Sequence, residues 1–251
     1  MPRFFVNKDS IIDNYIYITG EDAYHVARAL RMAEGDAVTV CDTDGIEYSC
    51  ILTRIRDEEC IAKIESEKKS LSEMPVRVSV YMGYPKGDKL EQVIQKSCEL
   101  GAYRIIPFES SRCIKRPKAE REDKQLIRMQ RIAYEAAKQS GRACVPTVSK
   151  TLSFEKMLCE IEGGIALFCY EGENALSLKS VIREAMATAR EKADAITEIS
   201  VIIGSEGGFS EDEAERARRA GAYICNLGKR ILRCETAPLY VLSALSYELE
   251  L

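Results

Sequence analysis

The sequence predicts an α/β protein with two domains: a small β-rich N-terminal domain, then a larger domain whose parallel sheet is covered by helices on both faces. Over the first 70 residues, short apolar segments of strand length follow one another with one helical pattern among them. From residue 76 onwards, strand-like and helix-like segments alternate, which is typical of a parallel sheet. Residues 65–73 are charged, offer no periodic apolar face and are interpreted as a linker. We therefore expect domains at 1–72 and 73–251.

The N-terminal domain is expected to be a small β-barrel with one helix. Asp44-Gly45 is a hairpin turn signal. The pattern over residues 21–31 predicts a helix with Tyr24, Ala27, Leu30 and, less strongly, Val26 on its apolar face, and with Arg28 and Arg31 toward solvent or a partner. The expected strands are 4–6, 15–18, 37–41, 48–56 and 60–64.

The larger domain is expected to alternate five strands with five helices. Two helix starts show a capping-box pair, Asp88 with Glu91 and Ser210 with Glu213. The helix that starts near Asp88 is expected to end at Gly101. The expected strands are 76–82, 103–108, 165–169, 198–203 and 223–227, and the other helices are 120–139, 178–191, 211–220 and a segment after Thr236.

Composition excludes several classes of protein. With 46% apolar and 30% charged residues the chain can bury a sizeable core, and it is neither disordered nor collagen-like. It has no uncharged apolar run of membrane-spanning length and no apolar segment of a secretory signal, so we expect no membrane partner and a cytoplasmic location. Ten cysteines without a C-x-x-C pair are interpreted as reduced thiols, and a single histidine, His25, argues against a metal site.

The sharpest local signal is ISVIIGSEGGFSEDE at residues 199–213, a β-branched strand followed by a glycine loop and a helix start. Loops between a parallel strand and a helix bind ligands in α/β proteins because glycines expose backbone N–H groups. The loop matches neither a dinucleotide motif nor a P-loop. Glu206 would repel a phosphate, so S-adenosylmethionine, with its sulfonium and ribose diol, suits the loop better than ATP. The alternative is a tight turn without a ligand.

A second loop, residues 228–235, follows the last expected strand. Thr236 is expected to cap the next helix, and Pro238 is tolerated in its first turn. Lys229, Arg230 and Arg233 oppose the helix dipole, so structure alone explains them poorly, although a solvated charge cluster is an alternative. Both loops are expected to open on the same edge of the sheet.

Nucleophilic catalysis by a cysteine is another alternative. Cys234 stands between Arg233 and Glu235, and a nearby cation lowers a thiol pKa. The sequence supplies no partner base, and Cys234 serves equally well as a small packing residue. We therefore favour packing.

Positive charge is concentrated in one segment. Residues 112–150 hold eleven Lys and Arg against four Asp and Glu, a net +7, which leaves −11 for the rest of a chain of net charge −4. Such a split predicts a polyanion-binding face on an acidic body, with an ordinary solvated helix face as the alternative. The stripe on the long helix consists of Lys124, Arg128, Arg131, Lys138 and Arg142.

Five sequence motifs follow one another along nearly the whole chain: RFFV at 3–6, HVARALRM at 25–32, EAAKQSGRACVP at 135–146, IGSEGGFS at 203–210 and LGKRILRCETA at 227–237. In this order they strongly resemble the RsmE family of 16S ribosomal RNA (uracil-N3)-methyltransferases in the SPOUT superfamily. Two positions depart from the family pattern: Ser205, where proline is usual, and Pro238, where alanine is frequent.

The resemblance implies a PUA-like RNA-binding β-barrel at the N-terminus and a SPOUT-type methyltransferase domain with a deep trefoil knot. It also implies a homodimer that uses S-adenosyl-L-methionine to methylate N3 of a uridine in 16S rRNA or the small ribosomal subunit. A non-catalytic RNA-binding protein that retains the knotted fold is an alternative. A nucleotide-binding module is another, but it would lack the P-loop lysine.

The resemblance also assigns residues. Arg233 is expected to stabilise charge on the uracil, with Glu235 or Glu206 as a weaker candidate base. The cofactor residues are expected to be Phe168, Tyr170, Glu171, Gly204, Glu206, Gly207, Gly208, Leu227, Gly228, Ile231, Leu232, Thr236 and Ala237. The RNA-binding residues are expected to be Arg3, Arg28, Arg31, Arg112, Gln139, Ser140 and Arg142, with His25 near the barrel arginines.

Overall fold

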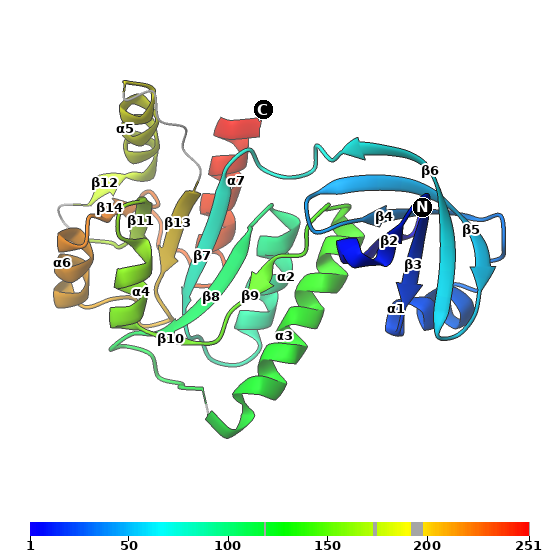
Figure 1. The fold of residues 1–251 in the computed structure, drawn as a ribbon. Coiled ribbons are helices and arrows are strands. Elements are labelled where there is room, and N and C mark those ends of the chain that lie inside the picture. The colour runs from blue at the N-terminus through cyan, green and yellow to red at the C-terminus, as the bar shows by residue number, and fades with distance from the viewer. Residues whose placement is uncertain (118, 173–174, 192–197, 251) are drawn as a thin grey trace. The chain divides into compact units, whose positions relative to one another are not determined.

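The chain forms two compact units in a computed structural model that describes residues 1–117, 119–172, 175–191 and 198–250 (Figure 1). Unit 1 comprises Met1–Glu73 and Ala137–Val145, and unit 2 comprises Met74–Ala136 and Pro146–Leu251. The division after Glu73 lies one residue from the expected boundary. The membership of residues 137–145 in unit 1 was not predicted from the sequence.

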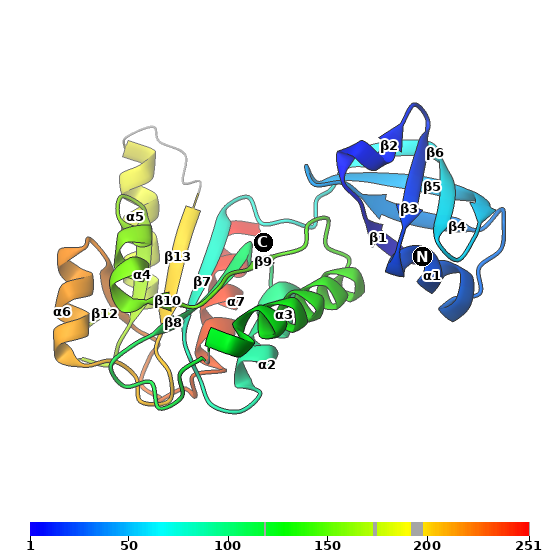
Figure 2. The same ribbon diagram turned by 60° about the horizontal axis from the view of Figure 1, so that its bottom comes forward.

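Unit 1 is a curled six-stranded sheet around one hydrophobic core (Figure 2). Neighbouring strands are antiparallel except β1 and β4, which are parallel. Phe4, Ile16 and Val38 are fully buried in its core. In sheet order the strands are β1 (Arg3–Phe5), β4 (Ala37–Cys41), β5 (Ile46–Ile55), β6 (Glu59–Lys69), β3 (Tyr15–Thr19) and β2 (Ile11–Ile12), and a 3-10 turn, η1 (Lys8–Ser10), precedes β2.

Two expectations for unit 1 were wrong. The segment interpreted as a linker is strand as far as Lys69, because its backbone pairs with β5 while its side chains remain in solvent. The expected helix over 21–31 is an α-helical turn, α1 (Glu21–Tyr24), followed by a π-helical turn, η2 (His25–Ala29). The wider π turn changes which side chains face the core, so Tyr24 and Leu30 are 58% and 41% exposed.

Unit 2 contains an eight-stranded sheet in which every pair of strands is parallel, as predicted. Its central strands are rich in β-branched residues and buried on both faces. In sheet order the strands are β10 (Leu152–Ser153), β8 (Arg104–Glu109), β7 (Arg77–Gly83), β13 (Glu198–Ile203), β11 (Ile165–Cys169), β14 (Tyr223–Asn226) and β12 (Leu176–Ser177), and β9 (Thr147–Val148) pairs with β8.

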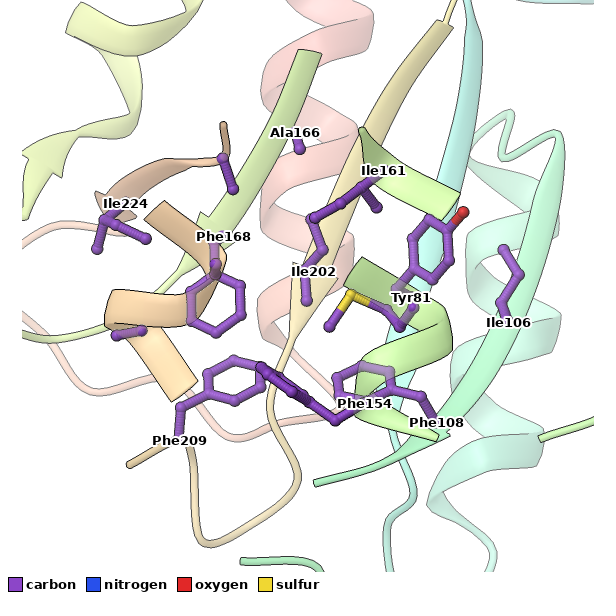
Figure 3. Close-up of a cluster of buried hydrophobic side chains, with 14 residues drawn as sticks. Tyr81, Ile106, Phe108, Phe154, Ile161, Ala166, Phe168, Ile202, Phe209 and Ile224 are labelled. Carbon is purple, nitrogen blue, oxygen red and sulfur yellow. The ribbon is translucent and has the colours of Figure 1, made fainter. Parts of the chain in front are cut away.

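Helices cover both faces of this sheet (Figure 1). On one face, α4 (Phe154–Ile161) and α6 (Glu211–Arg219) pack on a core that includes Tyr81, Phe168 and Ile202 (Figure 3). The rings of Phe168 and Phe209 lie 4.1 Å apart between their centroids. The opposite face carries α2 (Lys89–Glu99), α5 (Leu178–Glu191) and α7 (Ala237–Glu250), and α3 (Ala119–Ser140) packs against α2.

The two expected capping boxes differ in outcome. Ser210 and Glu213 form the complete reciprocal box at the start of α6. Asp88 precedes α2 but makes no capping bond; its carboxylate instead accepts from Gln92 Nε2 at 3.3 Å. Helix α4, which the sequence analysis did not predict, begins with Ser153 Oγ accepting from Lys156 N–H. A helix of eight residues offers too short a pattern to be recognised beside stronger neighbours.

All ten cysteines lie in the described part of the chain and are free thiols there. Among the described residues, no group of three or more potential metal ligands is found. No described helix combines the length and the apolar character that crossing a membrane requires.

Candidate active site

A cleft of about 620 Å³ lies at the carboxyl edge of the parallel sheet. Three loops line it because β11, β13 and β14 are parallel neighbours and end at the same edge. The first residue of α2, Lys89, and Arg112 in the loop after β8 also line it. The remaining lining residues are Cys169–Glu171, Ile203–Phe209, Asn226, Leu227, Ile231–Glu235 and Ala237. The expectation that the two glycine-containing loops open on one edge is thus confirmed.

The glycine loop after β13 is held by close backbone contacts. A Cβ on Gly204 would lie 2.9 Å from the Gly208 backbone, and one on Gly207 would lie 2.9 Å from the carbonyl oxygen of Arg112. Neither position accepts a side chain unless the backbone shifts. Ser205 is buried here, and its Oγ donates to the Arg112 carbonyl at 3.4 Å. The loop is therefore anchored against the segment that follows β8.

The loop after β14 combines apolar and cationic side chains. Leu227, Ile231 and Leu232 line the cleft, and Ile231 is 85% exposed. Arg233 is exposed, and no ion pair or side-chain hydrogen bond joins its guanidinium to the described part of the chain. Its five donors are therefore available to a ligand.

Two carboxylates in the cleft share one cation. Lys89 Nζ lies 2.9 Å from Glu206 Oε1 and 3.5 Å from Glu235 Oε2. Burial would raise the pKa of Glu206, but hydrogen bonds from Lys89 and from backbone N–H groups outweigh it and lower that pKa. For Glu235, burial is likewise outweighed, here by its own backbone N–H, Cys234 and Lys89, so its pKa is lowered as well. Both side chains are therefore charged at neutral pH.

Cys234 is a packing residue. Burial, followed by its hydrogen bond to Glu235, raises the pKa of Cys234 to about 12. The thiol lies 3.3 Å from Glu235 Oε2 and is protonated at neutral pH, whereas a nucleophile needs the thiolate. The preference for packing over nucleophilic catalysis is supported.

Comparison with known proteins fits this geometry. A family model described as an RNA methyltransferase domain matches residues 72–246, and one described as an RNA methyltransferase PUA domain matches residues 18–65. The ribosomal RNA small subunit methyltransferase E of Bacillus subtilis is 36% identical over 100% of this chain and 98% of its own length. The chain belongs to this methyltransferase E family.

Solved structures of similar proteins agree with the family assignment. A crystal structure of a hypothetical protein is 35% identical, covers 99% of this chain and 98% of its own, and gives a TM-score of 0.88. A methyltransferase E from Neisseria gonorrhoeae bound to S-adenosyl methionine is 28% identical over 99% of this chain and 98% of its own, with a TM-score of 0.82. The fold predicted from the sequence, a parallel-sheet methyltransferase domain with a PUA-type N-terminal domain, is confirmed.

For a methyltransferase E, the cleft brings together most of the residues that sequence reasoning proposed. Tyr170 and Glu171, four members of the glycine loop and the apolar residues of the last loop all line it. Phe168 is completely buried in the core, and its side chain does not reach the cleft, because strand alternation turns it inward. Gly228 and Thr236 also lie outside the lining.

Sequence reasoning missed Lys89, Cys169 and Asn226 in the lining of the methyltransferase cleft. One feature of the sequence could have indicated that Lys89 belongs to the site. A cation at the first position of a helix opposes the helix dipole, just as Arg233 does, and α2 starts at Lys89. Cys169 and Asn226 end strands that were predicted, but neither residue type distinguishes a ligand contact from a strand end.

The expected RNA residues have different environments. Arg112 is exposed at the cleft, where Nη1 donates to the Gly207 carbonyl at 3.3 Å. In unit 1, Arg31, Gln139 and Ser140 are exposed. Arg28 pairs with Asp57 at 2.6 Å, and Arg3 pairs with Glu47 at 2.9 Å.

Arg142 requires a correction. Its side chain is 3% exposed and forms an ion pair with Glu73, whose carboxylate also accepts from the N–H groups of Ala143 and Cys144. A guanidinium enclosed in this way does not reach an RNA phosphate. Lys138 is similarly engaged, with Asp22 at 3.2 Å and over the ring of Phe4 at 4.6 Å. The basic stripe expected on α3 is therefore not continuous in solvent.

Proposed function

We propose that this chain methylates ribosomal RNA of the small subunit with S-adenosyl-L-methionine, and that the acceptor is N3 of a uridine in 16S rRNA. One observation carries the proposal. The cleft is built from the three loops that follow adjacent parallel strands, in a chain that matches the gonococcal S-adenosyl methionine complex over 99% of its length.

The residues of the cleft suit this cofactor. Its volume of about 620 Å³ is within the usual range for small-molecule sites. Leu227, Ile231 and Leu232 offer an apolar wall for an adenine, while Glu206 and Glu235 place negative charge where a sulfonium and ribose hydroxyls are favoured. Lys89, the cation nearest these carboxylates, is engaged by both, which disfavours a nucleotide triphosphate in the same place.

When bound, the cofactor supplies an electrophilic methyl group on sulfur. The chain must bind uracil so that N3 faces this group, and N3 must lose its proton to a carboxylate or to water. As the proton leaves, negative charge develops on the two carbonyl oxygens beside N3. Arg233 is exposed at the cleft, and no described residue engages its guanidinium donors. It is assigned to those oxygens, where it stabilises the anion and so eases loss of the proton.

Glu206 and Glu235 are weak candidates for the base. Each has a lowered pKa because of the hydrogen bonds described above, and a lower pKa makes a carboxylate a poorer proton acceptor. We therefore assign them to cofactor binding first, and the largest catalytic contribution to Arg233 and to alignment of the reactants.

RNA is assigned to Arg112 at the cleft and to Arg31, Gln139 and Ser140 in unit 1. Arg3 and Arg28 would have to exchange an intramolecular carboxylate for a phosphate. The homodimer is supported by exposed Ile231, Tyr240 and Tyr247, which leave apolar surface on the last loop and on α7. The trefoil knot, the cytoplasmic location and the absence of a membrane partner remain predictions from the sequence.

Calorimetry and nucleoside analysis test the proposal together. The chain should bind S-adenosylmethionine and its demethylated product in preference to ATP. Small-subunit RNA from cells that lack the gene should lose N3-methyluridine, and the purified chain should restore it. A chain that binds RNA but neither cofactor form would be a non-catalytic RNA-binding protein, and one that binds ATP instead would be a nucleotide-binding module.

A further inference from the structure

Lys89 occupies an unfavourable place for a cation unless it has a partner. It is the first residue of α2, where the partial positive charge of the helix end repels an ammonium group. Hydrogen bonding to Glu206 raises the pKa of Lys89, so the side chain is an ammonium ion at neutral pH and not a proton acceptor. Its charge therefore serves the groups around it.

Those groups belong to two different cleft loops. Glu206 lies in the glycine loop after β13, and Glu235 lies in the loop after β14. Each carboxylate is within 3.5 Å of the same Nζ atom. Without that atom, two negative charges would face each other across the cleft wall.

Additional hydrogen bonds give this network a defined geometry. Glu206 Oε1 accepts from Lys86 N–H at 3.0 Å as well as from Lys89, and Glu235 Oε2 is bonded to the Cys234 thiol. The three charged side chains are only 18–29% exposed. Screening by solvent is therefore weaker than for an ordinary surface ion pair.

We propose that Lys89 is a positioning residue for the cofactor, which joins the glycine loop to the 227–235 loop so that their backbone groups face the ligand together. This inference rests on the proposed function, because the ligand is S-adenosylmethionine. Lys89 acts through Glu206 and Glu235, so its loss should weaken cofactor binding before it affects the methyl-transfer step.

The test compares matched lysine variants in the full chain. Lys96 lies in the same helix, and its one ion-pair partner among the described residues is Glu99, three residues away, so Lys96→Met is the control for Lys89→Met. Calorimetry with the demethylated cofactor should show at least tenfold weaker binding for Lys89→Met, less than twofold change for Lys96→Met, and recovery of most of the affinity in Lys89→Arg. Lys89→Gln replaces Lys89→Met should the methionine variant unfold.

A second measurement separates positioning from general support of the fold. Carbon-13 NMR of labelled glutamates should show the Glu206 pKa rising in the Lys89 variant, while the control leaves it unchanged. Wild-type affinity in Lys89→Met, or an unmoved Glu206 titration, overturns the role of Lys89. A wild-type chain that binds no S-adenosylmethionine overturns the proposed function itself, so the two failures are distinguishable.

Discussion

The backbone N–H of Ser111 donates a 2.6 Å hydrogen bond to Oε1 of Glu213, a carboxylate that is 3% exposed. The other oxygen, Oε2, accepts from the N–H and the hydroxyl of Ser210. Glu213 thus completes the start of α6 and also ties the loop after β8 to it. Both segments border the glycine loop.

Replacing Glu213 should destabilise the protein. Glu213→Ala removes a buried charged acceptor and half of a capping box, so we expect a loss of about 2–3 kcal/mol in the free energy of unfolding. Glu211→Ala, on the exposed side of the same helix, should change it by less than about 0.5 kcal/mol. Urea denaturation measures both, and equal effects would contradict the assigned role.

Arg142 should contribute to stability and not to RNA affinity. Arg142→Ala leaves Glu73 without its buried partner, so we expect the free energy of unfolding to fall by about 3 kcal/mol or more. The exposed Lys124 of α3 supplies the control, Lys124→Ala, which should alter stability by less than about 0.5 kcal/mol. If Arg142→Ala is as stable as the wild type and binds RNA more weakly, the structural role of Arg142 is contradicted.

Arg233 should act on turnover. Arg233→Ala should lower kcat for small-subunit RNA by about 100-fold or more, the usual cost of losing a donor at a developing oxyanion, with little change in cofactor affinity. Arg230 lies in the same exposed loop but outside the cleft lining, so Arg230→Ala should retain near-normal kcat. Single-turnover kinetics with saturating cofactor measure this, and an unchanged rate for Arg233→Ala would falsify the assignment.

The cleft carboxylates should make stability depend on acid pH. Glu206 and Glu235 have native pKa values below the ordinary 4.5, so the unfolded chain takes up protons first as the pH falls. Their stabilising contribution is full above that value and is lost as the pH falls through the lower native pKa. In urea titrations at pH 6 and pH 4, Glu206→Gln should lose less stability on acidification than wild type does. A larger loss would show that the sign is wrong.

Thiol reactivity should follow burial. Burial raises the pKa of Cys50 and of Cys234 to about 12, and that of Cys41 to about 11, whereas Cys159 is exposed. Iodoacetamide at neutral pH should therefore modify Cys159 first, as peptide mass spectrometry can resolve. Modification of Cys234 at the same rate would contradict its role as a packing residue.

The sequence predicted most of unit 2 because its signals are local and strong. Strands β11 and β13 and helix α5 have the predicted bounds, since β-branched runs and a helical period are visible without tertiary information. The π turn at His25–Ala29 could not be predicted from the sequence, because it depends on packing within unit 1. The same is true of β6 beyond residue 64, where backbone pairing extends a strand whose side chains are all polar.

The part of the site that could be predicted is the part that carries a backbone motif. Glycines after a strand mark a loop that approaches a ligand, and they led to Gly204–Gly208. Charge partners were not predictable, because they depend on contacts between distant segments: Lys89 meets Glu206, 117 positions away, and Arg142 meets Glu73, 69 positions away. Counting the cations along the chain therefore led to the prediction that Arg142 binds RNA, although its buried side chain pairs with Glu73.

The return of the chain to unit 1 at Ala137–Val145 bears on how the molecule can be divided. A fragment that ends at residue 72 would lack Arg142, Lys138 and Glu73, and Asp22 would lose its cation. Helix α3 contributes to both units, so neither is a contiguous module that can be excised at a linker. Transplanting the N-terminal unit to another enzyme would require the end of this helix as well.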